Sequence, residues 1–220
     1  MFDSIVKLDT PVKNAHNNVM AGIKQFDEDQ AMERAMHVFW HRGYAATSMQ
    51  DLAQATGVLR GSLYNAYGDK QAIFLLVFAR YQQRYLAAVR EKLAASDPAV
   101  ALREYFAYTI TSMSEPIPQV DDLPSSPTRG CLTTKIATDE KAMDEPVRQA
   151  LRGMLEGLGS VLEERLSAPD AQARLNLPLK EATRLLITFT RGTVVMERIY
   201  HAPDDLQAAA DSLIKILLSS

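Results

Sequence analysis

The fold is decided by residues 43–70, whose sequence is GYAATSMQDLAQATGVLRGSLYNAYGDK. Two short segments with helical spacing of apolar residues lie in this stretch, and Gly57 separates them. Ser48 and Asp51 have the spacing of a capping box, which predicts that the first short helix begins there. Helices of two turns do not persist alone in water. The sequence therefore predicts a pair of short helices that are held by packing on longer ones.

The two short helices have an apolar inner face and a polar outer face. The inner face carries Leu52, Ala53, Val58, Leu63 and Tyr67. The second helix, expected over about residues 59–64, presents outward Arg60, Gly61, Ser62, Tyr64 and Asn65. Such groups reach base edges and phosphates in the major groove, and glycine permits close approach. This layout favours a DNA-binding helix-turn-helix, and the alternative is a solvated face of a small helical domain.

The rest of the chain predicts more helices and no strand. Helical spacing places them at residues 27–42, 70–93, 131–140, 145–167, 178–200 and 203–218. One more begins at residue 98 and ends before a loop at 115–129. The fold class is therefore all-α, with about nine helices. Residues 1–25 are polar and aperiodic, so we expect a flexible leader, and Met20 would serve as an alternative start.

Composition is that of a folded soluble protein, with 47% hydrophobic and 23% charged residues. No apolar run is long enough to span a bilayer and no signal pattern begins the chain, so a cytoplasmic location is expected. A single cysteine, Cys131, excludes an intrachain disulfide and a zinc site built from cysteines. The net charge of −3 divides into +2 for residues 1–93 and −5 for residues 94–220, so a phosphate-binding surface would have to be local.

Residues 26–74 closely resemble the DNA-binding domain of TetR-family repressors. The resemblance is carried by FWHRGYAATSMQDLA at 39–53, TGV at 56–58 and GSLYNAYGDKQAIF at 61–74. It implies a sequence-specific transcriptional regulator, a repressor that a small-molecule effector releases from a palindromic double-stranded DNA operator. It also implies a homodimer, with effector binding and dimerisation in residues 75–220. The DNA contacts implied are Thr47, Ser48, Arg60, Gly61, Ser62, Tyr64, Asn65 and Lys70.

Three positions depart from the family's pattern. Leu59 stands where members usually have a Ser or Thr that caps the recognition helix. Ala66 replaces an aromatic residue or histidine that often contacts phosphate. Ahead of the first helix there is only Lys24 in place of a basic arm, so reading of the minor groove by an arm is not expected.

The C-terminal helices carry aromatic residues, methionines and hydroxyls that could line an effector pocket. The candidates are Tyr105, Phe106, Tyr108, Thr109, Met113, Cys131, Met154 and Phe189, and Tyr81, Tyr85 and Met196 lie at similar core-like spacing. Each of these side chains alone could equally belong to the core, but together they indicate a mostly apolar site. We expect a flat or apolar effector, with no demand for a strong charge, and the loop at 115–129 as the mobile rim.

The sequence RGCLT at 129–133 is similar to the start of the sixth helix in a TetR subgroup, some of whose members sense electrophiles through this cysteine. Arg129 and the helix N-terminus would lower the pKa of the Cys131 thiol. The alternative is a small packed side chain. His37 and His41 stand four apart on one helix, but no third ligand lies nearby in sequence, so neither a metal nor a cofactor is predicted.

Dimerisation is expected to use the last two helices, where Gly192 would allow close approach. The apolar residues assigned to this interface are Leu186, Phe189, Thr193, Leu206, Ala210, Leu213 and Leu217. The alternative is that they complete the core of the monomer. The chain has no nucleophile elbow, phosphate loop or dinucleotide glycine pattern, so it is not expected to be an enzyme. A DNA-binding protein without an effector stays open as another reading.

Overall fold

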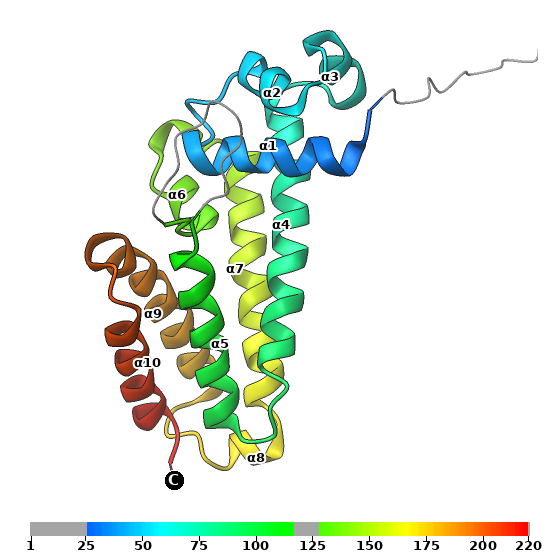
Figure 1. Cartoon of the computed structure of the whole chain (residues 1–220). Helices are drawn as coiled ribbons and strands as arrows, with labels where there is room; N and C mark the ends of the chain where they lie inside the picture. Colours follow the sequence, from blue (N-terminus) through cyan, green and yellow to red (C-terminus); the bar gives the residue numbers. More distant parts are fainter. Residues whose placement is uncertain (1–25, 117–127, 220) are drawn as a thin grey trace, which may run out of the picture.

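The structure is a computed structural model that describes residues 26–116 and 128–219 (Figure 1). Within them lie ten α-helices and one short 3-10 helix, so the predicted all-α class is confirmed. The elements are α1 (Glu28–Arg42), α2 (Met49–Thr56), α3 (Arg60–Tyr67), α4 (Lys70–Lys92), α5 (Pro98–Ser114), α6 (Leu132–Ala137), η1 (Glu140–Ala142), α7 (Glu145–Leu166), α8 (Pro169–Gln172), α9 (Leu179–Tyr200) and α10 (Pro203–Leu217).

The helices form an elongated body with a smaller unit at one end. Helix α1 lies across the upper ends of the long helices in Figure 1, and α2 and α3 lie beyond it at the tip. The long helix α4 runs from the tip into the body, where it packs against α5 and α7. Helices α9 and α10 lie together on one side, and α10 packs on α5. The arrangement leaves α3 at the far end of the molecule from the C-terminus.

Helix starts follow the capping residues that the sequence shows. The side chain of Asp69 accepts a hydrogen bond from the backbone N–H of Ala72 and begins α4. Ser48 and Asp51 form the expected reciprocal capping box at α2. Helix α3 begins one residue later than predicted, after Leu59, whose side chain offers no cap hydrogen bond. Helix α3 is therefore held by packing against its neighbours rather than by a side-chain cap at its first turn.

An aromatic cluster joins the tip to α4. Phe74 is fully buried, and its ring centroid lies 5.2 Å from that of Phe39 on α1 and 4.9 Å from that of Tyr44 in the turn before α2. Phe78 continues the cluster one turn further along α4, 5.6 Å from Phe74. These contacts make α4 the shared support of the helix-turn-helix and the body.

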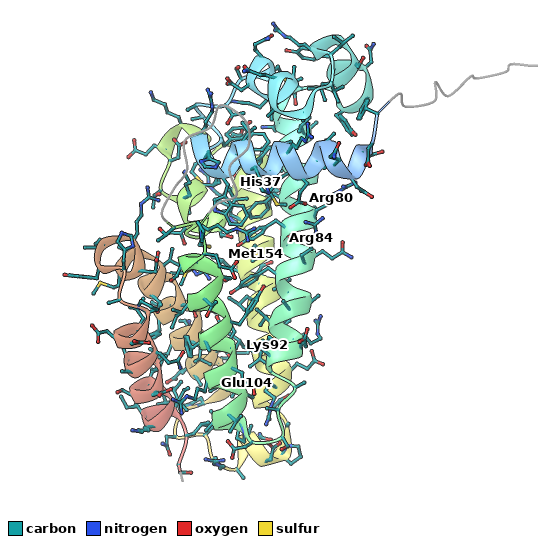
Figure 2. All side chains as sticks on the ribbon, in the orientation of Figure 1. His37, Arg80, Arg84, Lys92, Glu104 and Met154 are labelled. Carbon is teal, nitrogen blue, oxygen red and sulfur yellow. The ribbon has the colours of Figure 1, made fainter. Side chains whose placement is uncertain are left out.

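Ion pairs also fasten α1 to α4 along their exposed sides. The guanidinium of Arg80 lies 2.8 Å from the carboxylate of Asp29, and that of Arg84 lies 2.5 Å from Glu33. Figure 2 shows both arginines on α4 below α1, which bears His37. Deeper in the body, α4 and α7 approach closely at Gly157. A Cβ added at this residue would stand only 2.7 Å from a methyl carbon of Leu86.

The predicted helix at 131–140 divides into α6 and the 3-10 helix η1, and α8 was not predicted because a four-residue helix has almost no periodic signal. The expected leader at 1–25 and the middle of the expected loop at 115–129 lie outside the described residues. The ends of that loop are described, and there Arg129 donates its backbone N–H to the carbonyl of Glu115 at 2.7 Å. Among the described helices, none is long and apolar enough to cross a membrane.

Candidate DNA-binding face and effector cavity

The outer face of α3 is open to solvent. Leu63 is the buried residue of this helix, whereas Arg60, Gly61, Tyr64 and Asn65 are exposed. Ser62 is half-buried. Arg60 lies against Tyr64, with its guanidinium carbon 5.5 Å from the ring centroid. The tip of the molecule thus presents a cation, a phenol and an amide on one surface.

The residues predicted for phosphate contact divide into one exposed and two enclosed side chains. Ser48 is exposed at the start of α2, where its hydroxyl and its backbone N–H both donate to the Asp51 carboxylate at 2.8 Å. Thr47 is 2% exposed and donates its hydroxyl hydrogen to the carbonyl of Gly43 at 2.6 Å. Lys70 donates to the carbonyl of Tyr44 at 2.9 Å and lies over that ring. Thr47 and Lys70 therefore shape the turn between α1 and α2 rather than reach freely into solvent.

The sequence predicted that Leu59 does not cap α3, but it did not predict that the Leu59 side chain is exposed. The side chain is 80% exposed beside Arg60, so a large apolar group stands at the entry of α3. Arg42 was also missed. Its guanidinium lies 2.9 Å from the Asp51 carboxylate and fastens the end of α1 to the start of α2. The exposure of Leu59 follows from the register of α3, which a pattern of so few residues does not determine.

A cavity of about 310 Å³ lies beneath α1, between α4, α5 and α9. Four of the predicted effector residues line it: Tyr108, Thr109, Met113 and Cys131. Tyr81 and Tyr85, which the sequence also suggested, line it as well. Lining residues that the sequence did not suggest are Glu33, Met36, Trp40, Arg84, Ser112, Arg129, Gly130, Arg191 and Val194. The cavity is therefore more basic than expected, with Arg84, Arg129 and Arg191 in its wall.

The other four predicted effector residues do not line this cavity. Tyr105 is fully buried, and its hydroxyl lies 2.7 Å from that of Thr190 on α9. Phe106 packs edge-on against Phe189 at 5.4 Å between centroids. Met154 is buried on α7. These side chains join α5, α7 and α9 in the core, which is the alternative that their spacing left open.

Cys131 stands at the N-cap position of α6 and contacts Arg191 rather than Arg129. The Nη1 atom of Arg191 lies 3.3 Å from the Cys131 Sγ atom, and the hydroxyl of Tyr81 lies 3.8 Å from it. Burial alone would raise the pKa of the thiol. The Arg191 guanidinium and the backbone N–H of Thr134 outweigh burial and hold that pKa below its ordinary value. The predicted direction of the shift is thus present, with a different arginine as its source.

Arg129 instead connects the cavity wall to α1. Its guanidinium carbon lies 3.9 Å from the ring centroid of Trp40, and its carbonyl accepts a hydrogen bond from the Trp40 indole N–H at 2.8 Å. From α6, Lys135 donates to the carbonyls of Trp40 and His41 at 2.5 and 2.8 Å. The last turn of α1 is therefore held by residues on both sides of Cys131.

The two histidines of α1 do not form part of a metal cluster in the described chain, where no group of three or more His, Cys, Asp or Glu side chains lies within reach of one ion. Burial is the main cause that lowers the pKa of His37, although Glu33 at 3.7 Å opposes this shift. With its pKa lowered, His37 is a largely neutral side chain of α1 at pH 7.

The residues predicted for dimerisation lie mostly in the core of the protomer. Leu186, Thr193, Ala210 and Leu217 are buried, and Phe189, Leu206 and Leu213 are partly buried against them. A different side of α9 is exposed and apolar. We call it the α9 face; it consists of Leu185, Thr188, Gly192, Val195, Met196 and Ile199. No atom lies within 4 Å of a Cβ added at Gly192, so the centre of this face is open.

Known sequences match the chain mainly in the region that forms the tip. Residues 31–77 match the family described as bacterial regulatory proteins, tetR family. Over 86 residues the chain is 41% identical to the HTH-type transcriptional repressor ComR of Escherichia coli (strain K12), covering 38% of this chain and 41% of ComR. Over 94 residues it is 37% identical to YezE, an uncharacterized HTH-type transcriptional regulator of Bacillus subtilis (strain 168), covering 42% and 48%. The chain spans about half the length of the curated relatives it matches.

Solved structures are similar along most of the chain. A cysteine mutant of the TetR-family regulator CifR, in complex with a 26-bp operator DNA, matches with a TM-score of 0.74 and 26% identity, over 87% of this chain and 97% of that one. The reduced form of Escherichia coli NemR matches with a TM-score of 0.73 at 17% identity, over 87% and 96%, and shows the shared fold. CifR, ComR and YezE are each named as transcriptional regulators or repressors.

Proposed function

We propose that this chain, a TetR-family protein by its DNA-binding region and its fold, is a dimeric repressor that a small molecule releases from its operator. The observation that carries DNA binding is the outer face of α3, where Arg60, Tyr64 and Asn65 are exposed at the tip and only Leu63 is buried. An exposed polar helix of this kind fits the major groove.

The proposed contacts follow from the side chains that stay accessible. Arg60 and Asn65 have the donor and acceptor groups that recognise guanine and adenine. The proposed phosphate contact is the start of α2, where the exposed Ser48 would exchange its hydrogen bond to Asp51 for one to a phosphate. Thr47 and Lys70 support this surface from within, because their polar atoms hydrogen-bond to carbonyls of the α1–α2 turn.

Release would follow from the contacts between the cavity wall and α1. A ligand beside Cys131 touches the segment whose Arg129 and Lys135 hold the last turn of α1 at Trp40. Movement of this segment would move α1 and, through the Arg42–Asp51 ion pair, α2. The ligand shifts the equilibrium only as far as it binds the released state more tightly than the DNA-bound state.

The first test is selection of duplexes from a random-sequence pool by the purified protein, followed by titration of the selected operator. Replacement of Arg60 by Ala should weaken operator binding by about 1–3 kcal/mol and relax the preference at one base pair, because a base contact is lost. Arg103→Ala is the matched control, since Arg103 is exposed on α5 and pairs with Asp211 at 3.1 Å. Absence of any enriched sequence, or equal effects of the two variants, would contradict DNA recognition by α3.

Gly61→Ala should change stability and DNA binding in opposite directions. No atom lies within 4 Å of a Cβ added at Gly61, so the protein accommodates the methyl group and α3 gains up to about 1 kcal/mol in helix stability. The same methyl group projects from the DNA-facing side and should weaken operator binding several-fold.

The control is Gly153→Ala on α7, where an added Cβ also meets nothing within 4 Å. This variant should gain stability and leave operator binding unchanged. Thermal unfolding and fluorescence anisotropy give the two quantities. Undiminished operator binding by Gly61→Ala would show that α3 does not approach the DNA closely at this position.

A DNA-binding protein without an effector is the remaining candidate. The cavity at the α1 contact favours the effector-controlled form, because a permanent repressor has no need of an open, partly charged space there. A ligand that occupies the cavity and leaves operator affinity unchanged would favour the simpler function.

A further inference from the structure

The charges that face the cavity are unbalanced. Glu33 and Arg84 neutralise each other as an ion pair at the mouth. Arg129 and Arg191 remain, from the segment before α6 and from α9, and no carboxylate forms an ion pair with either of them among the residues that the structure describes. Two guanidinium groups in one cavity of about 310 Å³ favour an anion and oppose a cation.

Arg191 has hydrogen-bonding capacity that the described protein leaves unused. One Nη atom lies beside the Cys131 sulfur, but the Nε atom is buried and has no hydrogen-bond partner among the described residues. A guanidinium has five N–H donors in a planar fork that suits a carboxylate, and an unpartnered buried donor is costly. Burial would lower the pKa of Arg191, yet the neighbouring Cys131 and Tyr85 outweigh it, so the group stays a cation.

The walls around this cation are aromatic. The rings of Trp40 and Tyr81 stand nearly perpendicular with centroids 5.2 Å apart, and those of Tyr85 and Tyr108 are 6.1 Å apart. Burial raises the pKa of Tyr81 and of Tyr85 well above the ordinary value, so both phenols stay neutral donors. Aromatic faces of this kind hold one flat ring while hydroxyls contact its polar edge.

We infer that the effector is an aromatic monocarboxylate, with its carboxylate on the Arg191 guanidinium and its ring among Trp40, Tyr81, Tyr85 and Tyr108. This inference rests on the proposed function, since it names the chemical class of the effector. It keeps the expected flat molecule and adds a negative charge, which the sequence did not demand. The carboxylate competes with the Cys131 sulfur for the same cation. Arg129 is stacked on Trp40 of α1, so a displacement of Arg129 by the effector's ring would shift α1.

The test uses the full chain without DNA and a panel of benzoates, each paired with its benzamide, which has the same shape and no charge. Thermal shift and calorimetric titration should show binding of at least one benzoate and at least tenfold weaker binding of its amide. Arg191→Met should weaken benzoate binding about 10- to 100-fold, because a charge-assisted pair is lost. Arg103→Met, remote on α5, should bind as the parent does.

Arg191→Lys is a second variant, which keeps the test informative if Arg191→Met does not fold. It keeps the charge but loses the planar fork, so it should fold and bind benzoate with intermediate affinity. In the parent, bound benzoate should also slow alkylation of Cys131 by iodoacetamide at pH 7, because the carboxylate takes the cation that favours the thiolate. The benzamide should leave this rate unchanged.

Equal affinity for benzoate and benzamide, no binding of any benzoate, or undiminished binding by Arg191→Met and Arg191→Lys would each overturn the inference. Operator selection fails or succeeds independently of these titrations, which contain no DNA. Failure of benzoate binding with a normal operator would therefore reject the ligand class alone, and failure of operator selection with normal benzoate binding would reject the repressor function.

Discussion

Replacement of Met196 by Asp is expected to give a monomer that binds the operator at least about 100-fold more weakly than the parent. Met196 is 45% exposed in the protomer and lies in the α9 face, so the substitution removes no core packing. In a dimer that buries this face, the new carboxylate would lose its hydration without gaining a partner, and the same carboxylate of the second copy would stand nearby and repel it. Loss of the second half-site contact removes the gain of two linked binding events, which is about 10²–10⁴ in affinity.

Light scattering at micromolar concentration and anisotropy with the selected operator measure the two effects. Val100→Asp is the matched control, because Val100 is 46% exposed on α5 and lies outside the α9 face. It should stay dimeric and bind the operator normally. If Met196→Asp is still a dimer, or if the parent is a monomer, the α9 face is not the interface. A monomer that retains the parent's operator affinity would contradict the need for two recognition helices.

The helix-turn-helix could be predicted because its signals are local. The capping box of Ser48 and Asp51 and the N-cap Asp69 each fix a helix start within a few residues of sequence. Positive φ angles at Gly43 and Gly57 lie where the sequence has glycine, as the breaks between helices require. Such features depend on few neighbours, and so they survive in any packing of the longer helices.

The cavity could not be predicted from the sequence because its walls come from segments that meet only in the folded chain. Tyr105 and Tyr108 are three residues apart on α5, yet one bonds to α9 in the core and the other lines the cavity. Arg191 and Cys131 are 60 residues apart in the chain and 3.3 Å apart in the structure. Their contact depends on the rotation of α9 about its axis, which hydrophobic periodicity determines only roughly.

The α9 face was missed for a related reason. Helix α9 is apolar on two sides, and the sequence does not say which side meets the protomer and which is left for a partner. Leu186 and Thr193 turn toward the core, whereas Val195 and Ile199 remain exposed. The two sides have similar composition, so only packing against α5, α7 and α10 separates the buried side from the exposed one.

Phe74→Ala is expected to lower the free energy of unfolding by about 3–5 kcal/mol, because it empties a fully buried aromatic position. In the parent, the Phe74 ring packs against Phe39, Tyr44 and Phe78. Its removal therefore leaves a new void where α1 and the α1–α2 turn pack on α4. Hydrogen exchange should therefore accelerate in α2 and α3 before the body opens, since local stability varies within a fold. Operator binding should fall because α3 loses its support.

Phe106→Ala separates this local effect from general destabilisation. Phe106 is equally buried, but it lies in the body between α5 and α9, 5.4 Å from Phe189. Its removal should cost a similar free energy in urea or thermal unfolding and leave the exchange rates of α2 and α3, and operator binding at low temperature, close to those of the parent. Equal acceleration of α2 and α3 in both variants would show that the tip and the body open as one unit. Unchanged exchange in Phe74→Ala would show that the aromatic cluster is not what holds the recognition helix in place.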